Sequence, residues 1–505
     1  MKLKIFLVFT LIFLLIGSIG IVEQVNAENI LEVAKHMEAE GFDPHKVPAH
    51  SSIQLYMQVY EGLVSTSNEG DIVPQLAESW EIIDDTTYLF NLREGVLFHN
   101  GREMVAEDIQ YSFERILDPE TASIAKSNFE MVESIEIVDD YTVIFHLEYA
   151  YADFFINLAH VYSAIVPKEV IEEHGDLMNH MVGTGPFMLD TWNPDNYTLL
   201  VKNEDYYIEG QPVIDGIRYS IMTDESSRMA ALRSGTVHMS SISPEAVQIL
   251  EGTSGLDLVE YSNFDYTYLA FNVTEEPFDD PLVRKALSYA IDRELLAEIV
   301  FDGMAGVTGP VPPAQQIWAA DISEYPSYNY DPVKAQELLA EAGYEDGLKF
   351  EITTSSAYDY MVDTAVILQE ILQAANIEVE INLIEWGTYI DTWINRTHQS
   401  LVGLNGAGRT PDRSLYFFFH STGAANVWGF SDYEFDRIVE AARVEIDQEN
   451  RYKLYHEAQL MLVNELAPNL FLNTPSQFYA VRDEVNNFNP TPFQAEGQLK
   501  LITLD

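Results

Sequence analysis

The chain has 505 residues, which is too long for one ordinary domain core, so two or three domains are expected. Hydrophobic residues make up 47% and aromatic residues 12% of the sequence, and this composition excludes an intrinsically disordered chain. The 81 acidic residues against 27 basic ones give a net charge of −54, which excludes nucleic-acid binding because such a chain repels phosphate backbones.

The acidic residues are spread along the whole chain instead of being gathered in one tail. A dispersed acidic surface with few lysines indicates a halophilic host, where high salt screens the self-repulsion of the protein. An acidic protein of an ordinary habitat is the alternative. The chain contains no cysteine, which excludes disulfides, thiolate metal sites and a lipid-anchored cysteine.

The first 27 residues have the pattern of an export signal. Lys2 and Lys4 precede a nearly all-apolar stretch over residues 5–16, and residues 25–27 (VNA) fit a small-residue cleavage site. We expect cleavage after Ala27, a mature protein in the periplasm or outside the cell, and no lipid anchor. An uncleaved membrane anchor is the alternative, because the apolar stretch is of borderline length for a span.

The mature chain has mixed α and β patterns throughout, beginning with a strand-rich first half. Residues 142–147 alternate between apolar and polar side chains, which is typical of a strand, and a turn at residues 139–140 indicates a preceding strand near 135–138. Apolar residues at helical spacing predict one helix over residues 281–300, with Asp280 as its N-cap.

The second half has the alternating pattern of a parallel α/β sheet. Asp331 before a proline predicts the start of a helix that Gly343 ends. A strand at 348–354, a helix at 363–375 and a strand at 377–384 then predict a βαβ unit, and two helices follow at 434–445 and 449–465. The change in pattern predicts two lobes, with the transition near residues 268–272.

Motifs for metal and phosphate chemistry are broken in this chain. His456 and Glu457 begin the helical zinc-protease pattern, but Leu460 occupies the position of the second histidine. Residues 183–185 (GTG) are followed by Pro186, which lacks a backbone donor that a phosphate loop needs. We therefore expect no metal, no cofactor and no catalytic residues. A secreted hydrolase of peptides or oligosaccharides is the rival interpretation.

A polar loop at residues 406–412 (GAGRTPD) is the strongest candidate for binding a ligand. Its glycines allow a close approach of the backbone, and Arg409 offers a bidentate donor in a chain that is poor in cations. The nearby Trp386, Tyr389 and Trp393 either line a cleft or fill the core. A plain surface loop with an exposed arginine is the alternative.

Several collinear stretches of the mature chain are similar to those of one known family. In chain order they are residues 60–64 (YEGLV), 73–80 (VPQLAESW), 92–101 (LREGVLFHNG), 106–113 (AEDIQYSF), 183–187 (GTGPF) and 278–287 (FDDPLVRKAL). On these motifs the chain resembles the extracellular solute-binding proteins of the peptide/nickel class (family 5), which serve ABC importers. The resemblance covers essentially the whole mature chain.

The resemblance implies an α/β, type II-like periplasmic-binding-protein clamp of two lobes, with an extra subdomain in lobe 1. Lobe 1 would comprise residues 28–264, lobe 2 residues 265–474, and residues 475–505 would return to lobe 1. It also implies a monomer that is not an enzyme. Such a protein captures a small-molecule or peptide ligand between its lobes and delivers it to an ABC permease in the membrane.

The resemblance breaks at the positions that hold the charged ends of a dipeptide. Ala407 stands where dipeptide binders have an aspartate, and Ser356 stands near the position of their arginine. No histidine occurs in residues 403–412, which disfavours the nickel branch. We expect an oligopeptide or peptide-like ligand, with an oligosaccharide as the alternative. The expected contacts are Arg409 and Asp412 as polar anchors, Trp386 and Tyr358 as walls, and Gly406 and Ala407 as close backbone.

Overall fold

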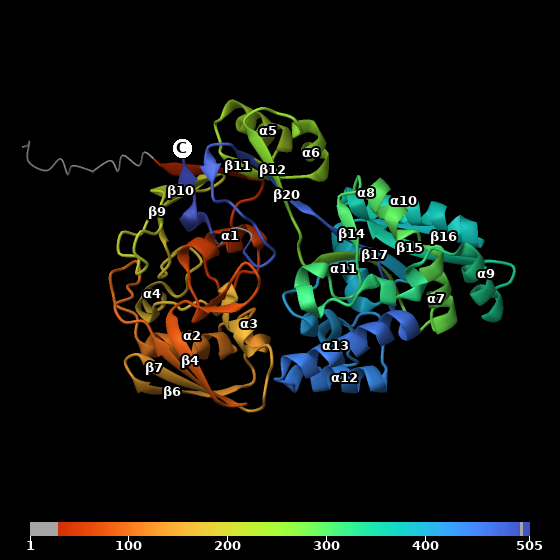
Figure 1. The fold of residues 1–505 in the computed structure, drawn as a ribbon, viewed down its shortest axis with the longest axis horizontal. Helices are drawn as coiled ribbons and strands as arrows, with labels where there is room; N and C mark the ends of the chain where they lie inside the picture. Colours follow the sequence, from red (N-terminus) through yellow and green to blue (C-terminus); the bar gives the residue numbers. More distant parts are fainter. Residues whose placement is uncertain (1–28, 495–497) are drawn as a thin grey trace, which may run out of the picture.

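The computed structural model describes residues 29–494 and 498–505, and it forms two lobes that lie side by side (Figure 1). The expected signal segment, residues 1–27, lies outside the described residues. Lobe 1 holds the first half of the chain and its C-terminal end, and lobe 2 holds the residues between them. The expected α/β organisation in two lobes is therefore confirmed.

Lobe 1 is built on a mixed seven-stranded sheet in the order β12-β20-β11-β1-β10-β9-β8. β1 is parallel to both of its neighbours, and its Leu31 and Val33 are buried in the lobe 1 core. The strands are β1 (Ile30–Lys35), β8 (Phe187–Asn193), β9 (Tyr197–Lys202), β10 (Gly216–Ile221), β11 (Met239–Ile242), β12 (Leu256–Tyr261) and β20 (Gln477–Arg482).

The extra subdomain of lobe 1 is a four-stranded antiparallel sheet in the order β4-β5-β7-β6, covered on one face by a helix. Alternate residues of β7 are buried, and Phe145 packs edge-on against Phe113 of that helix with ring centroids 5.0 Å apart. The elements are β4 (Ala77–Asp84), β5 (Thr87–Leu92), β6 (Val132–Asp139), β7 (Thr142–Leu147) and α2 (Ala106–Leu117). The expected strand at 142–147 is confirmed, and the strand before it is longer than expected.

A buried ion pair joins the subdomain to the rest of lobe 1. Arg115 of α2 donates to Asp43 at 2.5 Å, and both side chains are almost fully buried. His45 lies 2.8 Å from the same guanidinium, and burial and the charge of Arg115 lower its pKa to about 4, so His45 is neutral at pH 7.

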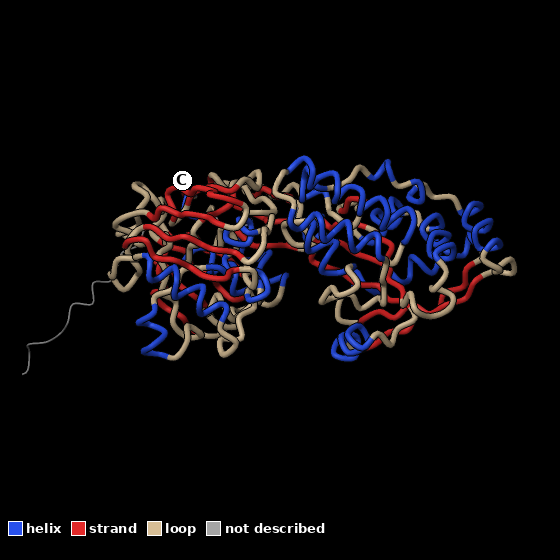
Figure 2. Tube along the Cα trace, turned by 90° about the horizontal axis from the view of Figure 1, so that it is seen from below, coloured by secondary structure: helices blue, strands red, loops and turns tan. Residues whose placement is uncertain are grey.

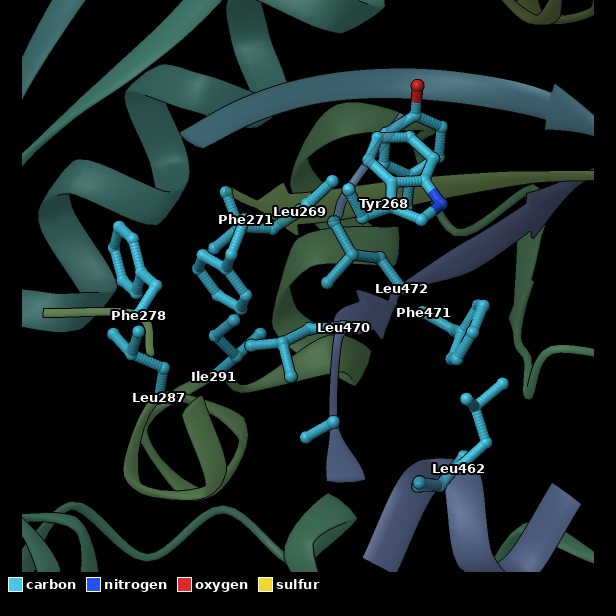
Figure 3. Packing of buried hydrophobic residues seen from close by; sticks show 14 of the residues in the cluster. Tyr268, Leu269, Phe271, Phe278, Leu287, Ile291, Leu462, Leu470, Phe471 and Leu472 are labelled. Carbon is cyan, nitrogen blue, oxygen red and sulfur yellow. The ribbon is translucent and has the colours of Figure 1, made fainter. Parts of the chain in front are cut away.

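Lobe 2 has a five-stranded sheet in the order β16-β15-β17-β13-β18, in which β15 is parallel to β16 and β17. The expected βαβ unit is confirmed: α10 connects β15 to β16. The elements are β13 (Asp265–Phe271), β15 (Leu348–Ser355), β16 (Ile377–Ile384), β17 (Ser400–Gly406), β18 (Asn469–Phe471) and α10 (Asp359–Leu372). Figure 3 shows side chains of β13 and β18 packed toward Leu287 and Ile291.

The expected single helix over residues 281–300 is wrong, because the structure has two helices there. α7 (Pro281–Ala290) ends before Asp292, whose side chain accepts a hydrogen bond from Leu295 N and so caps α8 (Arg293–Val300). The remaining lobe 2 helices are α9 (Pro332–Glu341), α11 (Trp386–Asn395), α12 (Tyr433–Val444) and α13 (Gln448–Met461).

Shorter elements complete the two lobes. The helices are α1 (His50–Val59), α3 (Phe154–Leu158), α4 (Lys168–His174), α5 (Glu225–Ser234) and α6 (Pro244–Leu250). The strands are β2 (Val64–Thr66), β3 (Ile72–Pro74), β14 (Ala305–Val307), β19 (Asn473–Pro475), β21 (Val485–Asn486) and β22 (Thr503–Leu504).

Two chain segments cross between the lobes, one from β12 to β13 and one from β19 to β20. Figures 1 and 2 show these strands running between the two lobes. The expected boundary at 264/265 falls where β13 begins, and the boundary at 474/475 falls within β19, which pairs with β14 of lobe 2. A double connector of this kind allows the lobes to rotate relative to each other.

Candidate functional site

An aromatic pocket of about 650 Å³ lies on lobe 2, and every residue that lines it belongs to that lobe. This volume is in the usual range for sites that bind small molecules. The aromatic residues that line it are Tyr268, Tyr358, Tyr360, Trp386, Tyr389, Trp393, Phe417 and Phe418. Tyr358 is 44% exposed and Trp386 is 38% exposed, so the pocket offers a large apolar surface that no part of the described chain covers.

Helix α11 presents three of these rings on one side, because residues 386, 389 and 393 follow one another at intervals of about one helical turn. The Glu385 carboxylate accepts a hydrogen bond from Gly387 N at 2.8 Å and fixes the start of the helix. The ring of Trp386 stacks on Tyr389, with centroids 5.4 Å apart, and meets Tyr358 edge-on at 5.1 Å. These ring contacts form one wall of the pocket.

The C-terminal end of β17 forms the floor of the pocket. A Cβ atom at Gly403 would lie 2.5 Å from the hydroxyl oxygens of Tyr268 and Tyr389, so only glycine lets these rings rest against the strand. The Tyr389 hydroxyl donates to the Val402 carbonyl oxygen at 3.0 Å. Gly406, at the end of β17, also lines the pocket.

Arg413 is the one charged residue among those that line the aromatic pocket. It begins a π-helical turn (Arg413–Phe417), and its Nε donates to the Gly406 carbonyl oxygen at 3.0 Å. The guanidinium lies over the rings of Phe417 and Phe418, at 4.6 and 5.8 Å from their centroids. π-Helical turns are often found at functional sites.

Arg409 lines a second cavity, of about 470 Å³, whose other walls come from lobe 1. Its Nη1 donates to the Ala159 carbonyl oxygen at 3.5 Å and its Nη2 to the Phe493 carbonyl oxygen at 3.3 Å, and both acceptors belong to lobe 1. Arg409 therefore bridges the two lobes. In the same cavity Glu61 accepts a hydrogen bond from the Tyr206 hydroxyl at 2.8 Å, and burial raises the pKa of Glu61.

A buried polar cluster next to Arg409 also spans the lobes, and we call it the interlobe contact. Asp153 of lobe 1 accepts a hydrogen bond from the Thr410 hydroxyl at 2.6 Å and lies 3.4 Å from Nη1 of Arg451. The Ala152 amide donates to the Arg443 carbonyl oxygen at 2.9 Å. Thr410, Arg443 and Arg451 belong to lobe 2, so the cluster holds the subdomain against it.

Asp412 completes the interlobe contact from the lobe 2 side. Its carboxylate is 2.9 Å from Nε of Arg443, although the two groups lack the alignment of a hydrogen bond. Burial and the nearby Asp153 raise the pKa of Asp412 to about 7, against the opposing charges of Arg443 and Arg451. Asp412 is 9% exposed and does not line the aromatic pocket.

The structure separates the six residues expected at the site into two groups. Three of them line the aromatic pocket: Tyr358, Trp386 and Gly406. Ala407 is fully buried and its amide donates to the Phe264 carbonyl oxygen at 2.9 Å, while Arg409 and Asp412 make the contacts between the lobes described above. As ligand contacts, all six stay predictions.

Several pocket residues were not singled out from the sequence, and Arg413 is the most important of them. The available signal was the spacing of Arg413 and Phe417, which are four residues apart and so lie on one side of a helical turn. Tyr268, on β13, shows no such signal, because its ring reaches the pocket through the pairing of β13 with β17.

No group of three or more histidine, cysteine or acidic side chains in residues 29–494 and 498–505 is arranged to hold a metal ion. No helix in this part of the chain combines the length and the apolar character that a membrane span requires.

Comparison with solved structures supports the arrangement of the lobes. The chain is similar to the periplasmic binding protein DppA from Helicobacter pylori in complex with the peptide STSA, with 28% identity and a TM-score of 0.78. The similarity covers 94% of this chain and 98% of that one. The expected clamp fold is therefore confirmed.

Comparison of sequences gives the same result. The chain is 30% identical to di/tripeptide-binding protein 2 of Pseudomonas aeruginosa, over 92% of this chain and 93% of the relative. It is 31% identical to heme-binding protein A of Haemophilus influenzae, over 90% and 88%. The family model of the bacterial extracellular solute-binding proteins, family 5, matches residues 71–426. The chain belongs to family 5 of the bacterial extracellular solute-binding proteins.

Proposed function

We propose that this protein is the solute-binding component of an ABC importer, which captures an oligopeptide or peptide-like ligand between its lobes and delivers it to the permease. The observation that carries the proposal is the aromatic pocket on lobe 2, which has exposed rings and a single cation in its lining. A relative named as a di/tripeptide-binding protein matches the sequence over 92% of this chain, and a solved structure in complex with a peptide shares the fold over 94% of it.

Binding would work by closure of the lobes around the ligand. Because the pocket is lined by lobe 2 alone, a ligand bound there leaves one side open to lobe 1. Contacts that lobe 1 makes only after rotation would shift the equilibrium toward the closed state, which the permease would recognise. Arg409 and Asp412, which lie at the lobe boundary, would act on this equilibrium, while Trp386, Tyr358, Gly406 and Ala407 would form or support the ligand surface.

An oligosaccharide is the second candidate ligand, because exposed aromatic rings also suit the apolar faces of sugars. A plain dipeptide is disfavoured, because Ala407 is buried and has no charge to offer a ligand ammonium group. We further propose that the protein releases its ligand unchanged, needs no cofactor or metal, and is not an enzyme.

The sequence of the first 27 residues supports a proposal for the location of the protein. We propose export by this signal and cleavage after Ala27, which leaves a monomer in the periplasm or outside the cell without a lipid anchor. The net charge of −54 supports a halophilic host and disfavours nucleic-acid partners.

The test is to identify a ligand and follow its fate. Native mass spectrometry of the protein purified from its host should detect a co-purified ligand at one equivalent per chain. After incubation, that ligand should be recovered unchanged. Formation of a hydrolysis product would contradict the proposal and favour a secreted hydrolase.

A further inference from the structure

Arg413 has hydrogen-bonding capacity that the protein does not use. Its Nε bonds to the Gly406 carbonyl oxygen, but its two terminal nitrogens have no hydrogen-bond partner among the described residues. Nor does Arg413 form an ion pair with any carboxylate of the described chain, although acidic residues outnumber basic ones three to one. The Nη1–Nη2 edge of the guanidinium is the one that binds a carboxylate with two parallel hydrogen bonds.

Arg409 differs in this respect, although it lies only four residues away. Its two terminal nitrogens donate to the carbonyl oxygens of Ala159 and Phe493, so lobe 1 already occupies its binding edge. Arg409 also lines the other cavity, whereas Arg413 lines the aromatic pocket. Of these two cations, Arg413 is therefore the one that is open to a ligand in the pocket.

The protein holds the Arg413 side chain in place from two sides. Gly408 has a φ of +72°, and a Cβ atom there would lie 2.5 Å from Cδ of Arg413, so the arginine stem packs directly against a glycine backbone. On the other side the guanidinium rests over the Phe417 ring. A side chain fixed in this way loses little conformational entropy when it binds a ligand.

Of the titratable groups near Arg413, His160 and Tyr162 are neutral at pH 7, whereas Asp265 is mainly ionised and acts on Arg413 without forming an ion pair. Burial and the charges of Arg409 and Arg413 lower the pKa of His160 to about 3, so this lobe 1 residue is neutral. Burial raises the pKa of Tyr162, also in lobe 1, to about 12, so it is neutral as well. Burial raises the pKa of Asp265 to about 6, and the charge of Arg413 acts against this rise.

We infer that Arg413 binds a carboxylate of the ligand, and that the ligand carries a flat apolar group beside that carboxylate, against the rings of Tyr358 and Trp386. The open edge of the guanidinium, its fixed position and the exposed rings of the same pocket together define this ligand class. A peptide with a free C-terminus and an aromatic last residue fits it. The inference rests on the proposed capture of a peptide-like ligand.

The experiment compares free acids with amides. A panel of dipeptides to pentapeptides ending in phenylalanine, tyrosine, leucine or alanine is prepared with a free C-terminal carboxylate and with a C-terminal amide. Binding to the wild-type protein and to the Arg413→Gln, Arg413→Lys and Arg409→Ala variants is measured by titration calorimetry at pH 7. Arg437→Gln is the matched control, because Arg437 is exposed on α12, pairs with Glu434 and does not line the pocket.

We expect the wild-type protein to bind the aromatic free acids at least about tenfold more tightly than their amides, because a charged hydrogen-bond pair is lost in the amide. This difference should disappear in Arg413→Gln, shrink in Arg413→Lys, which lacks the planar fork, and persist in Arg437→Gln. Thermal unfolding without ligand should show that the Arg413→Gln protein is folded.

Two results would overturn the inference, and only the second would also overturn the proposed capture of peptides. If acids and amides bind equally, or if Arg409→Ala removes the difference while Arg413→Gln keeps it, the assignment of Arg413 fails and peptide capture stands. If no peptide of either form binds, peptide capture itself fails and the inference fails with it.

Discussion

The interlobe contact makes a specific prediction for Asp412, whose carboxyl group has an ordinary pKa of 3.8 and a folded-state pKa of about 7. Between these two pH values the folded protein keeps the proton that the unfolded chain has lost. Raising the pH through this window therefore destabilises the folded state, and the full cost is present above pH 7. Asp412→Asn should remove this cost, because asparagine does not ionise.

The rise in pKa sets the size of the effect. A change from 3.8 to about 7 corresponds to at most about 4 kcal/mol, since one pKa unit equals about 1.4 kcal/mol. The charges of Asp153, Arg443 and Arg451 also act on Asp412, so the measured effect should be smaller than this upper figure but of the same sign. The stability of Asp412→Asn relative to the wild-type protein should thus increase steadily from pH 4 to pH 8.

Urea unfolding at several pH values from 4 to 8 measures this difference. Glu457→Gln, which removes one exposed carboxylate from α13, controls for the change in net charge and should give a difference that varies little with pH. A constant difference between Asp412→Asn and the wild-type protein over this range would refute the reasoning.

Three further substitutions test other parts of the structure. Asp43→Ala leaves the buried Arg115 without its carboxylate partner and should lower the free energy of unfolding by about 3–5 kcal/mol, measured by urea unfolding at pH 7. A loss below about 1 kcal/mol would show that the ion pair is not buried as described. Gly183→Ala places a Cβ atom against the Val59 carbonyl oxygen and should lower the melting temperature sharply, and an unchanged melting temperature would argue against that packing. Trp386→Ala should weaken binding of an identified ligand at least about tenfold while the free protein remains folded, and unchanged affinity would remove Trp386 from the site.

Local patterns in the sequence predicted much of the fold. The alternation at residues 142–147 and the βαβ unit at 348–384 depend on short-range periodicity, and both are present in the structure. The break between α7 and α8 was missed because the apolar spacing runs through it. Only the side chain of Asp292, which caps a new helix, reveals the interruption.

The candidate site was less accessible from sequence, because it depends on tertiary contacts. Tyr358, Trp386 and Gly406 were identified from composition and resemblance and line the pocket. Which of two arginines faces that pocket depends on whether lobe 1 occupies the binding edge of Arg409. No local sequence pattern shows which arginine lines the pocket. The position of Arg413 there depends on its hydrogen bond to the Gly406 carbonyl oxygen at the end of β17 and on its packing over Phe417.

Closure of two lobes around a captured ligand is the central claim, and small-angle X-ray scattering tests it most directly. Once a ligand has been identified, the radius of gyration should decrease when that ligand is added to saturation, because the lobes rotate together about the two crossing segments. Superimposable scattering profiles with and without ligand, under conditions in which calorimetry shows full occupancy, would contradict the account.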